Sequence, residues 1–161
     1  MFRKKKNGDI ESVCREQEKY ESFICESLNE RGIIVQQIGS RPPDRRCGNL
    51  LGLDIIYDPL MGKRGGVYIE TRVQEIPPLP FLFRSTLFRD VGAWLYGIGD
   101  YELFFIFGKK TLRRIVLERD KYFPGRGGLK PHQTDKGMGF IMPFERAEML
   151  AEKIFYFSSR F

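Results

Sequence analysis

The chain has 161 residues, of which 42% are hydrophobic, and its 27 Lys and Arg against 21 Asp and Glu give a formal net charge of +6. This composition excludes a disordered tail and indicates one globular domain that favours polyanionic partners. Three cysteines without a Cys-x-x-Cys pair and a single histidine argue against a disulfide scaffold, a thiolate zinc site and a histidine-rich metal centre.

The first half of the chain is predicted to hold one helix and three strands, over residues 10–31, 33–35, 51–57 and 67–73. Apolar residues recur at helical spacing from Ile10 to Leu28, and Gly32 ends the pattern. Apolar and polar residues alternate in each of the two longer strands. A turn rich in Gly and Lys, over residues 59–65, separates these two strands. We therefore expect them to form an antiparallel hairpin.

The second half is predicted to hold a helix over residues 87–95, strands over 103–107, 112–117 and 140–142, and a terminal helix through 147–157. Trp94 fits the apolar stripe of the first of these helices, so we expect it in the core. The order of elements predicts an α/β fold, a mixed sheet with helices packed on it. We expect a single domain over residues 1–161, with a short basic tail at 1–8 and a basic Gly-rich loop at about 120–139.

The N-terminal segment is basic and polar, and no segment approaches the roughly 20 apolar residues that a membrane span needs. The expectation is therefore a cytoplasmic protein without a membrane partner. The odd number of cysteines agrees with a reducing compartment.

Two carboxylates, Asp54 and Glu70, lie in the middle of apolar strands. Burying such a group is unfavourable unless it is paired or bound to a cation. In a hairpin both carboxylates can project from one face, and Arg72, two residues after Glu70, shares that face. Two carboxylates beside a fixed cation form a hard-oxygen site suited to Mg²⁺, which can polarise a phosphate and activate a water. The alternative is an exposed strand face with cross-strand ion pairs.

The stretch from Glu21 to Arg72 resembles the core of the PD-(D/E)xK nuclease superfamily and, within it, the archaeal type of Holliday junction resolvase. Four features carry the resemblance. The first two are a helical Glu eleven residues before a Gly, here Glu21 and Gly32, and a β-branched strand that runs to a Gly-Ser pair, here Ile33 to Ser40. The other two are an Asp-hydrophobic-hydrophobic strand, here Asp54 to Ile56, and a hydrophobic-Glu-x-Lys strand, here Ile69 to Arg72. The resemblance implies a restriction-endonuclease-like mixed β-sheet flanked by helices, with an α-β-β-β-α-β core.

The resemblance also implies roles for individual residues. Asp54 and Glu70 would bind Mg²⁺, with Mn²⁺ as a substitute, together with the carbonyl of Thr71, and Glu21 would bind or orient a metal through water. Arg72 stands where the family has lysine. Arginine stays charged and cannot act as a base, but it can position the attacking water or stabilise the phosphate. The expected catalytic set is Glu21, Asp54, Glu70 and Arg72.

Basic residues crowd two loops and the segment between them, which predicts contacts with nucleic-acid phosphates. The expected contacts are Ser40, Arg41, Arg45, Arg46, Lys109, Lys110, Arg113, Arg126, Lys130 and Lys136. A run of charge is also typical of a solvated face. His132 has no second metal-binding neighbour in the sequence and is expected to be a loop residue or a phosphate contact.

Together these features predict a Mg²⁺-dependent endodeoxyribonuclease, a structure-selective enzyme like a Holliday junction resolvase that acts as a homodimer on branched or duplex DNA. Two alternatives stay open. The long basic loops favour a site-specific endonuclease of the homing or restriction type on the same core. Arg72, in place of lysine, favours a DNA-binding protein with a degenerate nuclease site.

Overall fold

The structure is a computed structural model that describes residues 7–33, 37–38, 48–49, 52–73, 85–88, 93–118, 129–134 and 137–157. Its helices are α1 (Asn7–Asn29), α2 (Met61–Arg64), α3 (Lys109–Leu117) and α5 (Phe144–Leu150). Its strands are β1 (Gln37–Ile38), β2 (Gly48–Asn49), β3 (Leu53–Tyr57), β4 (Gly66–Val73), β5 (Leu95–Gly99), β6 (Leu103–Gly108), β7 (Lys130–Gln133), β8 (Gly137–Pro143) and β9 (Lys153–Tyr156).

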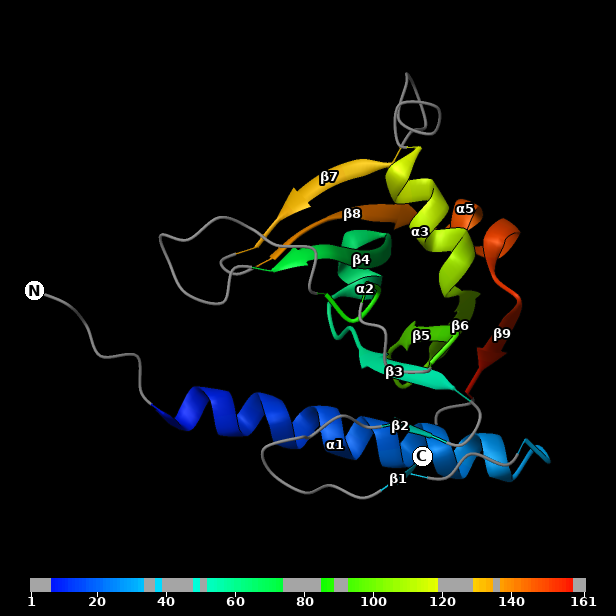
Figure 1. Cartoon of the computed structure of the whole chain (residues 1–161). Coiled ribbons are helices and arrows are strands. Elements are labelled where there is room, and N and C mark those ends of the chain that lie inside the picture. The colour runs from blue at the N-terminus through cyan, green and yellow to red at the C-terminus, as the bar shows by residue number, and fades with distance from the viewer. Residues whose placement is uncertain are drawn as a thin grey trace, which may run out of the picture.

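The strands form two main sheets and one short pair (Figure 1). The larger sheet has the order β3-β5-β6-β9, in which β3 and β5 are parallel and the other neighbours are antiparallel. The smaller sheet is antiparallel, with the order β4-β8-β7, and β1 pairs with β2. The protein therefore belongs to the mixed α/β class, as predicted.

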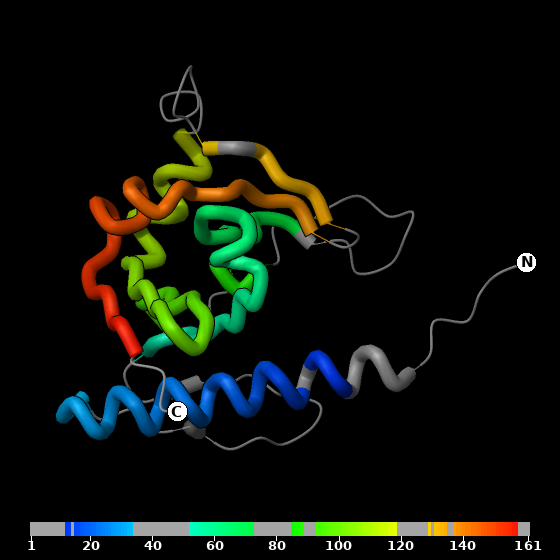
Figure 2. The backbone as a smooth tube through the Cα atoms, turned by 180° about the vertical axis from the view of Figure 1, so that it is seen from behind, coloured from blue at the N-terminus to red at the C-terminus, as the bar shows by residue number. Residues whose placement is uncertain are grey.

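Helix α1 covers one face of the larger sheet, and Figures 1 and 2 show it running along one side of the molecule. The predicted apolar stripe is buried there, where Tyr20, Ile24 and Leu28 pack against apolar side chains of β3 and β6. The helix begins at Asn7, so it includes the last residues of the predicted basic tail. Within the described ranges, no helix combines the length and apolar character that crossing a membrane requires.

The opposite face of the larger sheet packs against α3, α5 and the smaller sheet. This second core contains Tyr96 and Ile98 of β5, Phe105 and Phe107 of β6, Leu112 and Ile115 of α3, and Val67, Ile69, Phe140 and Met142 of the smaller sheet. Side chains alternate along a strand, so successive residues of β3 enter the two cores in turn. Asp54 therefore points toward the second core.

The predicted hairpin of β3 and β4 is not formed. Strand β3 pairs with β5, whereas β4 pairs with β8. The reason lies in the connection, where residues 61–64 form the helix α2 and Gly65, at φ 67°, ends it. Asp58, directly after β3, accepts hydrogen bonds from the backbone N–H of Leu60 and of Tyr68 and pairs with Arg64. These bonds fix a wide turn that directs β4 into the other sheet.

Four further predictions are wrong. The described parts of the predicted helix over 87–95 are not helical, since residues 87–88 lie in a turn and Leu95 begins the strand β5. Trp94, expected in the core, is 66% exposed. Residues 112–117 are helical in α3, where Leu112 and Ile115 are buried at helical spacing. The terminal helix ends at Leu150, and the following residues form β9 against β6.

Other predictions are confirmed in part. Strands over 51–57, 67–73, 103–107 and 140–142 match β3, β4, β6 and β8. Strands β7 and β8 also extend into the predicted Gly-rich loop, and His132 lies on β7 with its ring at the edge of the Tyr68 ring, 5.3 Å between centroids. Most of the predicted strand at 33–35 and residues 119–128 of the basic loop lie outside the described residues.

Candidate active site

Asp54 is buried in the middle of β3 and pairs with a lysine. Only 7% of Asp54 is exposed, and its Oδ2 forms an ion pair with Nζ of Lys109, the first residue of α3. Lys109 is 2% exposed, so both charges are removed from water. The expectation that a mid-strand carboxylate needs a cation is confirmed, but the cation comes from α3.

The pair is energetically demanding. A lysine at the start of a helix lies at the positive end of the helix dipole, and burial penalises both charges. Among the described residues, neither Asp54 Oδ2 nor Lys109 Nζ has another hydrogen-bond partner. Each group therefore depends on the other. Because Lys109 is buried, it does not form part of the exposed phosphate-binding surface on which the sequence placed it.

Glu70 lies on β4 and reaches the same region from the smaller sheet. Burial raises the pKa of Tyr96 well above its ordinary value, and the charges of Glu70 and then Asp54 raise it further. Tyr96 is the register partner of Asp54 in β5, so its ring points into the same core. The two carboxylates therefore act on one buried hydroxyl, although they come from different sheets.

Glu70 also acts on Tyr68 and lies beside the backbone of β8. Burial, with the charge of Glu70 as the next largest cause, raises the pKa of Tyr68 to about 12. A Cβ on Gly137 would overlap the Glu70 carboxylate, so the backbone of β8 passes directly beside it. Because Gly137 has no side chain, the Glu70 carboxylate can occupy the space beside it.

A β-bulge lies next to Glu70. Glu70 is opposite Gly139 and Arg72 is opposite Met138, so Thr71 has no Cα partner in β8. The Thr71 hydroxyl donates a hydrogen bond of 3.0 Å to the Met138 carbonyl. The extra residue reverses the alternation of side chains: Gly139 and Met138 are consecutive in β8, and cross-strand partners share a face, so Glu70 and Arg72 lie on opposite faces of the smaller sheet. The prediction that these two side chains share one face is therefore wrong. Bulges of this kind are common beside active sites, where they redirect side chains.

Glu21 is on the other side of β3. It is buried on α1, where its Oε1 accepts a hydrogen bond of 2.6 Å from Gln17 Nε2. Gln17 also binds the edge of β3, because Nε2 donates to the Ile55 carbonyl and Oε1 accepts from the Tyr57 N–H. Since α1 packs on the face opposite to the Asp54 side chain, the predicted grouping of Glu21 with Asp54 and Glu70 is not formed. Glu21 positions the Gln17 amide.

Replacing Gln17 with alanine is expected to lower the free energy of unfolding by about 1–3 kcal/mol, because the edge of β3 and Glu21 lose their hydrogen bonds to the amide. Urea denaturation followed by circular dichroism measures the change. Lys19→Ala is the control, since Lys19 is exposed and makes only an ion pair with Glu16 one turn away. Equal stability of the two variants would show that Gln17 does not support the strand.

The predicted phosphate contacts that the structure describes lie on α3 and β7. Lys110 is exposed on α3, and Arg113 is half-buried, with its Nε donating to the Leu87 carbonyl at 2.7 Å and its guanidinium 5.9 Å from the centre of the Phe88 ring. Lys130 belongs to β7. The remaining expected contacts lie outside the described residues and are Ser40, Arg41, Arg45, Arg46, Arg126 and Lys136.

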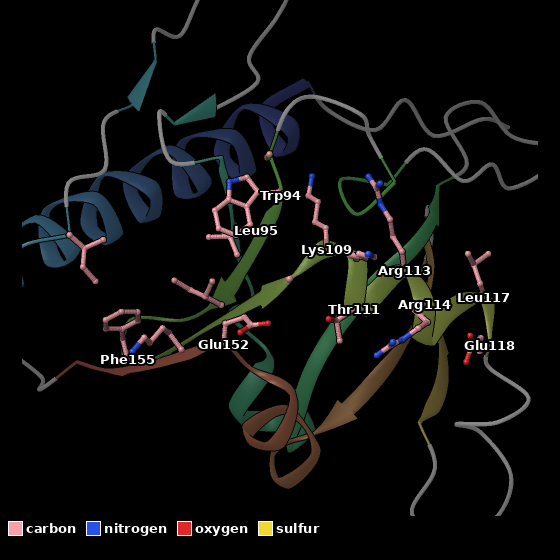
Figure 3. Close-up of a pocket in the computed structure, with 16 residues that line it drawn as sticks. Trp94, Leu95, Lys109, Thr111, Arg113, Arg114, Leu117, Glu118, Glu152 and Phe155 are labelled. Atoms are coloured by element: carbon pink, nitrogen blue, oxygen red, sulfur yellow. The ribbon is translucent and has the colours of Figure 1, made fainter.

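A groove of about 1290 Å³ lies between α3 and the ends of β5, β6 and β9. Figure 3 shows Trp94 and Phe155 along one side and Arg113, Arg114 and Leu117 of α3 along the other. Lys109 contributes to the lining, so the groove borders the Asp54 ion pair. Sequence reasoning missed Trp94 here, because its place in an apparent helical stripe suggested burial.

The donors available for a cation are the carboxylates of Asp54 and Glu70. Among the residues that the structure describes, no three His, Cys, Asp or Glu side chains are grouped closely enough to hold a metal ion. Two carboxylates with a nearby backbone carbonyl still form a hard-oxygen donor set of the kind that Mg²⁺ uses together with water. No protein-family model matches this chain, and neither the curated proteins nor the solved structures provide a significant match to it.

Proposed function

We propose that the protein is a metal-dependent endodeoxyribonuclease whose site contains Asp54, Glu70 and Arg72. The observation that carries the proposal is the buried Asp54 carboxylate in the middle of β3, with Glu70 of the other sheet beside a β-bulge. The charges of both carboxylates act on the buried Tyr96 hydroxyl and raise its pKa. Carboxylates gathered in a partly dry region repel one another unless a cation is present. A protein has little reason to assemble such a site for stability alone.

The proposed ligands of Mg²⁺ or Mn²⁺ are Glu70, the Thr71 carbonyl at the bulge and the oxygen of Asp54 that does not pair with Lys109. A bound metal of this type polarises a phosphate and lowers the pKa of a bound water. Lys109 is a positioning residue, since its ion pair holds the Asp54 carboxylate in one orientation. The Tyr96 hydroxyl is protonated at neutral pH, as in an ordinary tyrosine, and burial raises its pKa further.

Arg72 is the cation best placed to act on the substrate. It is half-buried on β4, directly after the bulge that follows Glu70, whereas Lys109 is buried against Asp54. A guanidinium can hold two phosphate oxygens at once and stabilise charge that develops in the transition state. It stays protonated, so the base that removes a proton from water must be another group.

The resemblance to PD-(D/E)xK nucleases supports DNA as the substrate, and a resolvase-like homodimer on branched DNA is the form we propose. The motifs occur in the order that the family requires. The pairing of β3 and β4 with other strands is a difference from the expected hairpin, so the restriction-endonuclease-like core is proposed from the motif order alone.

Glu70→Gln is expected to abolish metal-dependent cleavage while leaving DNA binding intact, because it removes one charged ligand and keeps the side-chain volume. The measurement is incubation of labelled four-way junctions, duplexes and single strands with Mg²⁺ or Mn²⁺. Glu148→Gln, at an exposed position on α5, is the matched control and should cut like the parent. Cleavage by Glu70→Gln at the parental rate would contradict the site.

A second candidate is a nucleic-acid-binding protein that does not cut. The observation that favours it is the ion pair itself, since Lys109 already supplies Asp54 with a cation and no metal is needed to stabilise that carboxylate. In this case the parent protein binds DNA but cuts none of the substrates with either metal.

A further inference from the structure

We infer that the groove between α3 and Trp94 binds unpaired nucleotides of single-stranded DNA, with a base stacked on Trp94 and phosphates on the cations of α3. The inference deepens the proposed function, since it names the part of the DNA that is held beside the site. It does not depend on cleavage, because binding needs neither the metal nor the carboxylates.

Trp94 is an exposed aromatic ring on a rigid backbone. It is 66% exposed, although tryptophan is on average largely buried. Its backbone N–H donates to the Gly52 carbonyl at 2.8 Å, and its carbonyl accepts from the Lys109 N–H at 2.9 Å. The bonds join it to the residue before β3 and to the first residue of α3, so its backbone is held on both sides. Stacking of a base on such a ring contributes about 1–3 kcal/mol.

The other aromatic ring of the groove is less available. Phe155 lies on β9 and is half-buried, and the guanidinium of Arg31 lies 5.6 Å from its centre. Trp94 has no comparable ring or cation contact among the described residues. Trp94 is therefore the aromatic ring of the groove on which a base can stack.

Helix α3 carries an unusual concentration of positive charge. Its sequence KKTLRRIVL places four cations in the first six positions and contains no acidic residue. Lys110 and Arg114 are exposed and one turn apart, where like charges repel, and within the described chain neither has an ion pair. The dipole of α3 adds to this unfavourable energy at its N-terminal end. A bound polyanion removes both unfavourable terms.

The groove as a whole is complementary to one strand of nucleic acid. Besides Lys109, which is paired with Asp54, four cations and two carboxylates line it, together with apolar side chains. Its volume of about 1290 Å³ exceeds the roughly 300–1,000 Å³ of a small-molecule pocket. A paired base hides its faces within the stack, whereas an unpaired base can lie on Trp94. Single-stranded DNA fits this combination better than duplex DNA does.

The test uses the fluorescence of Trp94, which is the only tryptophan of the chain. Oligo(dT) titrated into the full chain in EDTA should quench the emission and saturate, and a duplex of equal length should bind at least tenfold more weakly. Trp94→Ala should weaken oligo(dT) binding, followed by anisotropy of a labelled strand, by about 5- to 150-fold. Trp94→Phe should keep most of the affinity. Met149→Ala, at an exposed apolar residue of α5, is the control that should bind like the parent.

The cations are tested separately by salt dependence. Lys110→Gln and Arg114→Gln should each reduce the slope of log affinity against log salt by about 0.7, the value for one phosphate contact on a single strand. Lys63→Gln, at an exposed lysine of α2, should leave the slope unchanged.

Four results would overturn the inference, of which the first three concern Trp94. These three are an emission that oligo(dT) does not change, a Trp94→Ala variant with parental affinity, and self-association of the chain that buries Trp94, which would make a second copy the occupant. Equal quenching by an acidic peptide would also overturn it, since charge alone would then explain binding. Failure of the proposed nuclease activity can be told apart from failure of the groove. Glu70→Gln must still bind oligo(dT) if the groove is correctly assigned, whether or not the parent protein cuts DNA.

Discussion

Replacing Lys109 with methionine is expected to lower the free energy of unfolding by about 3–5 kcal/mol. Methionine fills a similar volume but leaves the Asp54 carboxylate buried without a cation, and an unpaired buried charge is among the most destabilising changes in a protein. Urea denaturation at pH 7 measures the loss. Lys110→Met, at the exposed neighbouring residue, should change stability by less than about 0.5 kcal/mol.

Adding Asp54→Asn to Lys109→Met separates the effect of the unpaired charge from the effect of changed packing. The double variant should recover most of the lost stability, because replacing both partners of a buried pair is often nearly neutral. A single variant as stable as Lys110→Met would show that solvent reaches the pair. A double variant no more stable than the single one would show that packing of the lysine, and not its charge, supports the fold.

The sequence predicted the need for a cation at Asp54 but not its source. Asp54 is flanked by the apolar residues Leu53 and Ile55, and this local pattern alone indicates that its carboxylate is buried. Lys109 is distant in sequence and begins a helix that the pattern did not predict. The expected hairpin placed Arg72 beside Asp54, and only the pairing of β3 with β5 shows that α3 supplies the partner.

The missed elements have a common physical cause, which is that packing overrides local pattern. Residues 95–99 lie in a strand because β5 approaches its neighbours closely, and a Cβ on Gly97 or Gly99 would overlap Phe104 or the Leu103 carbonyl. Those glycines suggested the end of a helix instead. Similarly, β-branched residues in α3 favoured a strand, while the burial of Leu112 and Ile115 requires helical spacing.

Helix α1 and the strands β3, β4 and β6 were predictable because each carries a long, regular pattern that agrees with its burial. Helix α1 buries Tyr20, Ile24 and Leu28 at helical spacing. Strand β6 is a continuous apolar run with both faces covered, one by α1 and the other by the second core. The pairing of these strands depends on contacts across the whole chain, which a single sequence does not specify.

Arg72→Ala is expected to slow DNA cleavage by about 10²–10³-fold with little change in affinity. The reason is that Arg72, next to Glu70 on β4, would contact charge that develops mainly in the transition state, and such a contact changes turnover and not binding. Arg72→Lys should retain or raise the rate, because lysine is the usual residue at this position in the family that the chain resembles. Single-turnover rates with Mg²⁺, measured beside affinities in EDTA, separate the two quantities.

The control for Arg72 is Arg146→Ala, which removes a half-buried arginine from α5 and should leave the rate unchanged. Three equal rates for the parent, Arg72→Ala and Arg72→Lys would assign the catalytic cation to another residue, and Lys109 would be the first to test because it touches Asp54. Lys109→Arg then keeps the charge and the ion pair while it changes the shape of the donor, so a fall in rate without a fall in stability identifies Lys109 as the acting group. No cleavage by the parent with any divalent metal, together with a loss of stability in Arg72→Ala, would instead favour the binding protein, in which Arg72 serves the fold.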